Sequence, residues 1–140
     1  MMRRLRMAWR ADSGQALVEF AMVLPLLLIL VIGLAEFSRA WNTKQVITDA
    51  AREGLRSSVV ANPGFSSGDV VGLVNQALIR ATIDPARADV TVEGFRAGTG
   101  TPARIQIDYR YDFGFFGPLI GWAAEDRTLV LSTSFVMRNE

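Results

Sequence analysis

Residues 16–35 read ALVEFAMVLPLLLILVIGLA, and no other part of the chain constrains its architecture as strongly. Glu19 is the one charged residue in this run, and Leu, Val and Ile make up most of the residues after it. Twenty helical residues rise roughly 30 Å, which is the thickness of the hydrocarbon core of a bilayer. A domain built from 140 residues is too small to surround such a helix, which disfavours a buried core helix. The sequence therefore predicts a transmembrane helix over residues 15–35.

The residues before the apolar run are basic. Arginines occupy positions 3, 4, 6 and 10, and Asp12 is the only acid before Glu19. The positive-inside rule places this end in the cytoplasm and everything after residue 35 outside it. A cleaved secretory signal is the alternative, because Gly33 and Ala35 are small residues at a possible cut. The apolar run is longer than the core of such signals, which favours a retained single-pass anchor.

A second kind of processing site lies just before the apolar run. A cut after Gly14 would make Gln15 the first residue and Glu19 the fifth, as in type IV pilin precursors. The cut would remove four arginines and Asp12, taking the formal charge from +1 to about −2. It would also create a free amine on Gln15, roughly 6 Å and one helical turn from Glu19. Glu19 could instead snorkel to the headgroups, so these residues alone leave both readings open.

Three blocks of sequence together resemble a known family. They are residues 14–21 (GQALVEFA) with the Leu-rich stretch after them, residues 36–37 (EF) and residues 50–54 (AAREG). In register with a basic leader and an apolar span, they resemble the TadE-like proteins of tight-adherence (Flp-type) pilus assembly. The resemblance implies a minor pilin or pseudopilin with a pilin-like α+β fold. It implies processing between Gly14 and Gln15, and an assembly role for Glu19 and Phe20.

The same resemblance implies the partners. They are a prepilin peptidase, other pilins or pseudopilins, an inner-membrane assembly platform and the lipids of the bacterial cytoplasmic membrane. Nucleic acid is not expected, because 15 basic residues are balanced by 14 acidic ones. The alternative from another class is a single-pass or secreted extracytoplasmic binding module that is not processed as a pilin.

The sequence after the span predicts a further helical segment followed by a small domain. Apolar residues recur at three- and four-residue steps over 36–61, which predicts an amphipathic extension of the same helix. In this extension Ala50, Ala51 and Gly54 are small enough for close helix packing. The leader is residues 1–14, and residues 62–140 form the extracytoplasmic α+β domain.

That domain is expected to contain a short helix and about three strands. Ser66 or Ser67 can cap the helix, which Asp84-Pro85 closes. Alternating patterns over 89–95, 104–113 and 128–138 predict an antiparallel sheet packed on a helix. The apolar loop at 114–122 (GFFGPLIGW) is expected either to cover the edge of the sheet or to contact the membrane or a neighbouring subunit.

The composition excludes most chemistry. With no Cys and no His, the chain has no disulfide, catalytic thiol or imidazole base, and no metal or cofactor is expected. Asp108 and Asp112 alternate with Arg104 and Arg110, which is typical of cross-strand ion pairs rather than acid–base catalysis. The protein is therefore not expected to be an enzyme.

Overall fold

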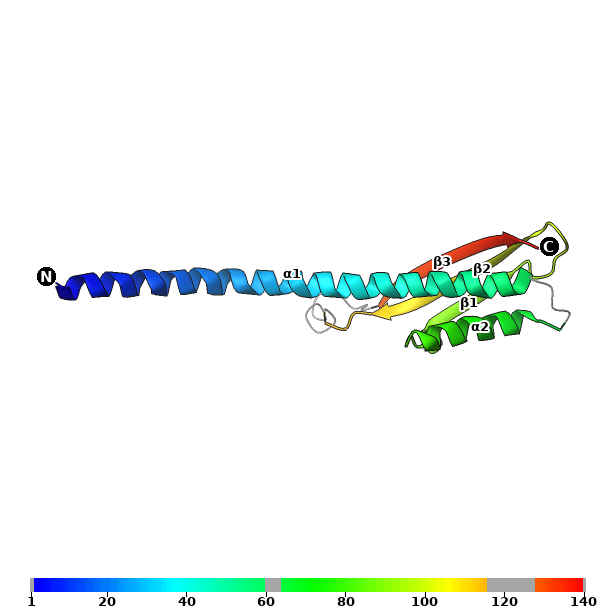
Figure 1. Ribbon diagram of the computed structural model, residues 1–140, viewed down its shortest axis with the longest axis horizontal. Coiled ribbons are helices and arrows are strands. Elements are labelled where there is room, and N and C mark those ends of the chain that lie inside the picture. The colour runs from blue at the N-terminus through cyan, green and yellow to red at the C-terminus, as the bar shows by residue number, and fades with distance from the viewer. Residues whose placement is uncertain (1, 60–63, 116–127, 140) are drawn as a thin grey trace.

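The structure, a computed structural model, describes the backbone of residues 2–59, 64–115 and 128–139 and the side chains from residue 14 onward in these ranges. It consists of a very long helix that projects from a small folded domain (Figure 1). Most of the apolar loop predicted at 114–122 lies outside the described residues, as does the predicted end of the helix extension at residue 61.

Helix α1 runs from Met2 to Val59 without a break. It begins well before Gln15, where the sequence pattern placed the start of the helix. Residues 3–13 are mainly Arg, Leu, Met and Ala, which are good helix formers, and Gly14 is accommodated inside the helix. The basic leader and the apolar run are therefore one continuous helix in the uncut chain.

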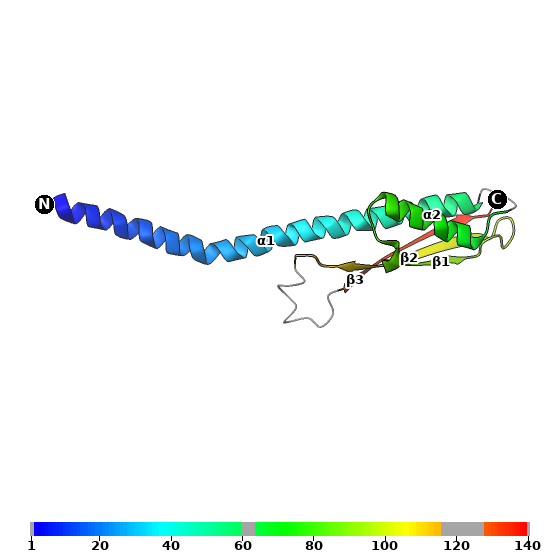
Figure 2. The same cartoon turned by 90° about the horizontal axis from the view of Figure 1, so that it is seen from below.

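Helix α1 is bent within its N-terminal half (Figure 2). Pro25 lies inside the helix in this half. A proline removes the backbone hydrogen bond to the residue four positions earlier, here Ala21, and its ring crowds that carbonyl. Sharp bends in helices occur most often at prolines, so we attribute the bend to Pro25.

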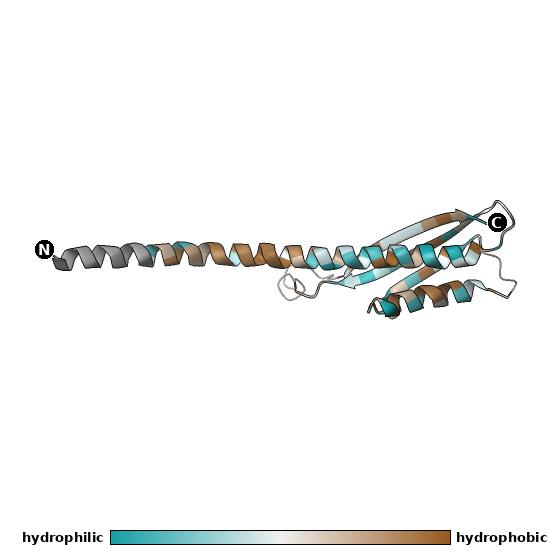
Figure 3. Cartoon of the chain, in the orientation of Figure 1, coloured by the Kyte–Doolittle hydropathy of each residue, from teal (hydrophilic) through white to brown (hydrophobic). Residues whose placement is uncertain are grey.

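Hydropathy changes sharply along α1. After Glu19 its N-terminal half is almost entirely apolar, whereas its C-terminal half alternates between polar and apolar residues (Figure 3). The described large hydrophobic side chains between residues 17 and 31 are all substantially exposed. The buried residues of α1 begin at Glu36 and continue to Val59. Only the C-terminal half of α1 therefore belongs to the folded domain.

Helix α2 (Ser67–Arg80) lies beside this half of α1 (Figure 1). Ser66 is its N-cap: the Ser66 side chain accepts from the backbone N–H of Asp69, and the Asp69 carboxylate accepts from the backbone N–H of Ser66. This capping box satisfies two backbone donors at the start of the helix. Val70, Val74 and Leu78 form its buried stripe, as the sequence pattern predicted.

The sheet has three antiparallel strands in the order β1 (Ala88–Glu93), β2 (Pro102–Asp112) and β3 (Thr128–Arg138). A short 3₁₀ turn η1 (Pro85–Arg87) leads into β1. The central strand β2 pairs Ile107 with Val90 on one side and Ile105 with Phe135 on the other. The α+β class and the antiparallel sheet of three strands are confirmed.

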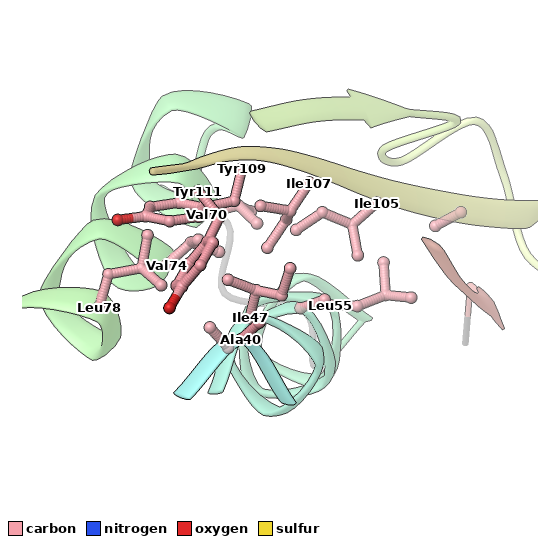
Figure 4. Packing of buried hydrophobic residues seen from close by; sticks show 13 residues of the cluster. Ala40, Ile47, Leu55, Val70, Val74, Leu78, Ile105, Ile107, Tyr109 and Tyr111 are labelled. Carbon is pink, nitrogen blue, oxygen red and sulfur yellow. The ribbon is translucent and has the colours of Figure 1, made fainter. Parts of the chain in front are cut away.

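Both helices cover the same face of the sheet and share one core with it. The buried residues come from α1, α2 and β2, with Ile47 and Leu55 pointing at Ile105 and Ile107 (Figure 4). The opposite face of β2 is polar, as the strict alternation of its residues predicts. This two-layer domain holds the C-terminal half of α1 rigidly, so the apolar half projects from a fixed base.

One expectation about the polar face needs correction. Asp112 forms its ion pair with Arg87 of η1, with 2.6 Å between the carboxylate and the guanidinium, and not with a residue of a neighbouring strand. Asp108 accepts instead from the side-chain amide of Gln106, 2.9 Å away. The pattern along β2 identified the charged face, but it could not reveal that η1 brings an arginine to the edge of the sheet.

Candidate functional site

The residues expected to act in processing and assembly lie together on the projecting half of α1. Gly14, Gln15, Glu19 and Phe20 are all exposed and helical. The side-chain amide of Gln15 donates to the Glu19 carboxylate over 3.0 Å, across one turn of the helix. Phe20 also points outward and contributes to the apolar surface around the carboxylate.

Glu19 is an acid on an otherwise apolar surface. Among the described side chains, its partner is the neutral amide of Gln15, and no cation lies within ion-pair distance. A carboxylate in such surroundings is costly to bury in lipid or protein unless a positive group meets it. The arrangement is therefore suited to recognising a cation that another chain, or a new N-terminus, would supply.

Segment Gly14–Val59 is long and apolar enough to cross a membrane, and its most apolar window is entirely unburied within the chain. An apolar helix that is exposed all round needs a nonpolar environment outside its own domain. The chain therefore carries one candidate membrane span, near its N-terminus, among the residues that the structure describes.

The structure places Ala50, Ala51 and Gly54 far along α1 from Glu19, in the core of the folded domain. They lie where α1 packs against α2 and the sheet. A methyl group added to Gly54 would come within 2.8 Å of Val74 Cγ2 and 3.4 Å of Ile105 Cδ1. The absence of a side chain at Gly54 thus lets α2 approach α1 closely, within one chain.

A buried carboxylate lies where the apolar half of α1 meets the folded domain. Glu36 is only 1% exposed, and it is the first acid after the apolar run. Its Oε1 accepts from the Tyr111 hydroxyl at 2.8 Å and from the Gly114 backbone N–H at 3.0 Å. Its Oε2 accepts from the Phe115 backbone N–H at 2.9 Å. Glu36 thereby joins α1 to the end of β2 and to the two residues that start the following loop.

This carboxylate stays ionised in the folded chain. Burial favours the neutral acid, but the donors from Phe115, Tyr111 and Gly114 together outweigh it and lower the pKa of Glu36 below its usual value. Arg39 contributes a smaller effect, with Nη1 at 3.7 Å from Oε1. Burial and the bond to Glu36 raise the pKa of the Tyr111 hydroxyl to about 12. The ionised Glu36 therefore holds α1 against the end of β2 and the two residues that follow it.

Sequence reasoning did not assign a role to Glu36, although it lies in one of the blocks that carry the family resemblance. One signal was present: a tyrosine on the inward face of β2 needs a partner for its hydroxyl when buried. The identity of that partner was not readable, because Tyr111 lies 75 residues from Glu36 in the sequence.

No group of three or more His, Cys, Asp or Glu side chains that could hold a metal ion occurs in the part of the chain that the structure describes. Glu36 already has three hydrogen-bond donors and the nearby guanidinium of Arg39.

Comparison with known proteins agrees with the sequence pattern. The family model described as TadE-like protein matches residues 14–56. No curated protein and no solved structure matches the chain. The matched region begins at Gly14, includes Glu19, Glu36 and Gly54, and ends inside the folded domain. The resemblance is thereby confirmed over residues 14–56, where the chain matches the TadE-like family, and together with the candidate membrane helix it suggests a membrane protein associated with the tight-adherence pilus.

Proposed function

We propose that the protein is a minor pilin or pseudopilin of the bacterial cytoplasmic membrane that supports assembly of a tight-adherence pilus or a related secretion filament. The observation that carries this proposal is the exposed carboxylate of Glu19, five residues after Gly14 on an unburied apolar helix. The family match that begins at Gly14 supports the same register.

Processing would prepare the chain for assembly. A prepilin peptidase would cut between Gly14 and Gln15 and remove the basic leader. The cut exchanges a net positive segment for a single positive amine at the start of the apolar helix. That amine would lie one turn from Glu19, on the residue whose side-chain amide donates to the Glu19 carboxylate in the uncut chain.

Assembly would then use the charge of Glu19. If helices of neighbouring subunits pack with a stagger of one turn, the carboxylate of one subunit meets the ammonium of the next. In surroundings of low dielectric constant, this pairing offsets the cost of burying either charge and penalises other registers. The partners are other pilins or pseudopilins, together with the inner-membrane platform on which they assemble.

The folded domain would serve as the extracytoplasmic part of the subunit. Helix α2 and the sheet hold the C-terminal half of α1 in one orientation. The bond between Tyr111 and Glu36 fixes that orientation at the point where the apolar half meets the domain. A subunit built in this way delivers its apolar helix to neighbours at a defined angle.

Replacing Glu19 tests the assembly role. In Glu19→Ala the helix should still insert, because the substitution makes the span more apolar, but co-assembly and pilus output should be lost. Met22→Ala is a matched control, since Met22 is also exposed in the span and carries no charge. Its pilus output should equal that of the wild type. Normal pilus output from Glu19→Ala cells would disprove the pairing role.

A further inference from the structure

Exposed hydrophobic side chains outside the apolar half of α1 gather at one end of the folded domain. Seven large ones lie beyond residue 34 in the described part of the chain: Phe37, Trp41, Ile79, Phe115, Leu129, Val130 and Val136. Five of the seven lie near Glu36, where the apolar half of α1 meets the folded domain. Phe37 and Trp41 follow Glu36 on α1, and the backbone N–H of Phe115 binds the Glu36 carboxylate. Leu129 and Val130 pair with the end of β2 that contacts Glu36. Ile79 and Val136 lie farther away.

The aromatic residues at this end lie on opposite sides of α1. Phe37 and Trp41 stack with their ring centroids 6.2 Å apart. They line a shallow groove of about 370 Å³ with Leu34 and Ser38. At about 100° per residue, these two rings lie roughly 100–140° around the helix from Glu36.

Phe115 lies on the side of Glu36, which binds its backbone N–H. The guanidinium of Arg39 lies 5.5 Å from the centre of the Phe115 ring. We call Phe37, Arg39, Trp41 and Phe115 the collar. It combines residues from α1 with one from the segment after β2, and its aromatic rings flank the helix over about one turn.

The level of the collar matches the headgroup layer of a membrane. If the span ends near residue 35, Phe37 and Trp41 lie about 3 and 9 Å beyond it, at 1.5 Å per residue. The headgroup layer extends roughly 5–8 Å beyond the hydrocarbon core on each side. The backbone of Trp41 lies just past this layer, but helical side chains point back toward the N-terminus, which brings the Trp41 ring toward it. Aromatic side chains are enriched in this layer, where one part of the ring meets lipid and another meets water.

We propose that the collar seats the folded domain in the phospholipid headgroup layer on the extracytoplasmic side of the membrane. This inference rests on the membrane anchoring in the proposed function. A helix of a partner protein would cover only one side of α1, whereas a lipid layer would contact it on every side. Because the collar has aromatic rings on two sides of α1, it fits a lipid layer better than a partner helix. The Arg39 side chain is 56% exposed, so donors not directed at Glu36 are available to lipid phosphates.

Glu36 has a specific task in this arrangement. Phe115 is distant in sequence from α1, and the bonds from Gly114 and Phe115 to the Glu36 carboxylate hold it at the collar. Without them, Trp41 would still enter the headgroup layer as part of α1, but Phe115 would be free to leave it. The domain would then lose its second point of contact and its fixed tilt.

Depth-dependent fluorescence quenching tests the collar. The full chain, with Trp9, Trp41 and Trp122 each changed to Phe, receives one tryptophan at a time and is reconstituted in phosphatidylethanolamine and phosphatidylglycerol vesicles containing brominated acyl chains. Phe115→Trp should be quenched several-fold more than Val136→Trp. The two positions are matched in exposure, at 58% and 55%, but lie at opposite ends of the domain.

Two further variants separate the possible outcomes. Phe20→Trp reports anchoring alone, so quenching at 20 without quenching at 115 would overturn the collar and leave the anchor standing. No quenching at 20 would overturn both. Adding Glu36→Gln should reduce quenching at 115 while a tryptophan at 41 stays quenched. If cross-linking showed the tryptophan at 115 to be shielded by a second protein chain, a protein partner would replace the lipid as occupant and the inference would be wrong.

Discussion

At the scale of single residues, Glu36 explains how the apolar half of α1 and the folded domain are joined at a fixed angle. One carboxylate accepts from a strand hydroxyl and from two backbone amides, and a guanidinium lies nearby. Hydrogen bonds to charged groups stabilise folded proteins more than those between neutral groups. Removing the charge should therefore loosen the junction before it affects the remainder of the core.

This role predicts a pH dependence. Because the folded chain lowers the pKa of Glu36, its stabilising effect is present above the ordinary value of 4.5 and is lost as the pH falls below it. At neutral pH, Glu36→Gln should cost about 1–3 kcal/mol in the free energy of unfolding of the domain. Denaturant titrations of the full chain in detergent, followed by near-ultraviolet circular dichroism, would measure this cost.

The same titrations at several pH values provide the control. Glu36→Gln should flatten the loss of stability below pH 4.5, whereas Glu93→Gln, at an exposed position on β1, should leave it in place. An unchanged loss in Glu36→Gln would mean that another group is responsible.

Two glycines give a matched test of close packing. Gly54→Ala would bring a methyl group within 2.8 Å of Val74 Cγ2, and the resulting overpacking should destabilise the domain by about 1–3 kcal/mol despite the better helix propensity of alanine. Gly72→Ala, in α2, meets nothing within 4 Å and should stabilise it by about 0.5–1 kcal/mol. Thermal unfolding of both variants would measure the difference, and equal effects would refute the close contact.

At the scale of elements, the sequence predicted most of the fold. Alternation along 104–113 identified the inward face of β2, and the Ser66 cap and Asp84-Pro85 bracketed α2. These features depend on neighbours a few residues apart. The pairing of Arg87 with Asp112 and the bonds to Glu36 were not predictable, because a local pattern does not record contacts between distant segments. The early start of α1 has a local cause, because residues 3–13 are mainly good helix formers.

The bend in α1 is a property of one element, and it predicts the effect of replacing Pro25. Pro25→Ala should restore the backbone hydrogen bond and straighten the helix. The chain has no cysteine, so spin labels at Leu17→Cys and Leu34→Cys, both exposed, would report the change without interference. The distance between the labels should increase in Pro25→Ala.

Labels at Asn42→Cys and Arg56→Cys, both exposed on the part of α1 that belongs to the folded domain, serve as the control. Their separation should not change. If the distance across Pro25 also stayed the same, the bend would have a cause other than the proline.

At the scale of the whole molecule, the chain separates two tasks. The apolar half of α1 makes no tertiary core of its own and presents Glu19 on its surface, whereas the folded domain has a hydrophobic core of its own. The near-neutral charge of the whole chain hides this division, because a basic leader balances a more acidic remainder. Removing the leader would therefore alter the charge of the chain without touching the folded domain.

The central claim is that the chain is processed as a pilin, and the intact mass of the protein from native membranes tests it most directly. A mature chain that begins at Gln15 is the predicted result, and a methylated amine would strengthen it. A chain that begins at Glu36 would contradict the claim and indicate a secreted domain released from its signal. A chain that retains Met1 would also contradict it and leave an unprocessed single-pass anchor.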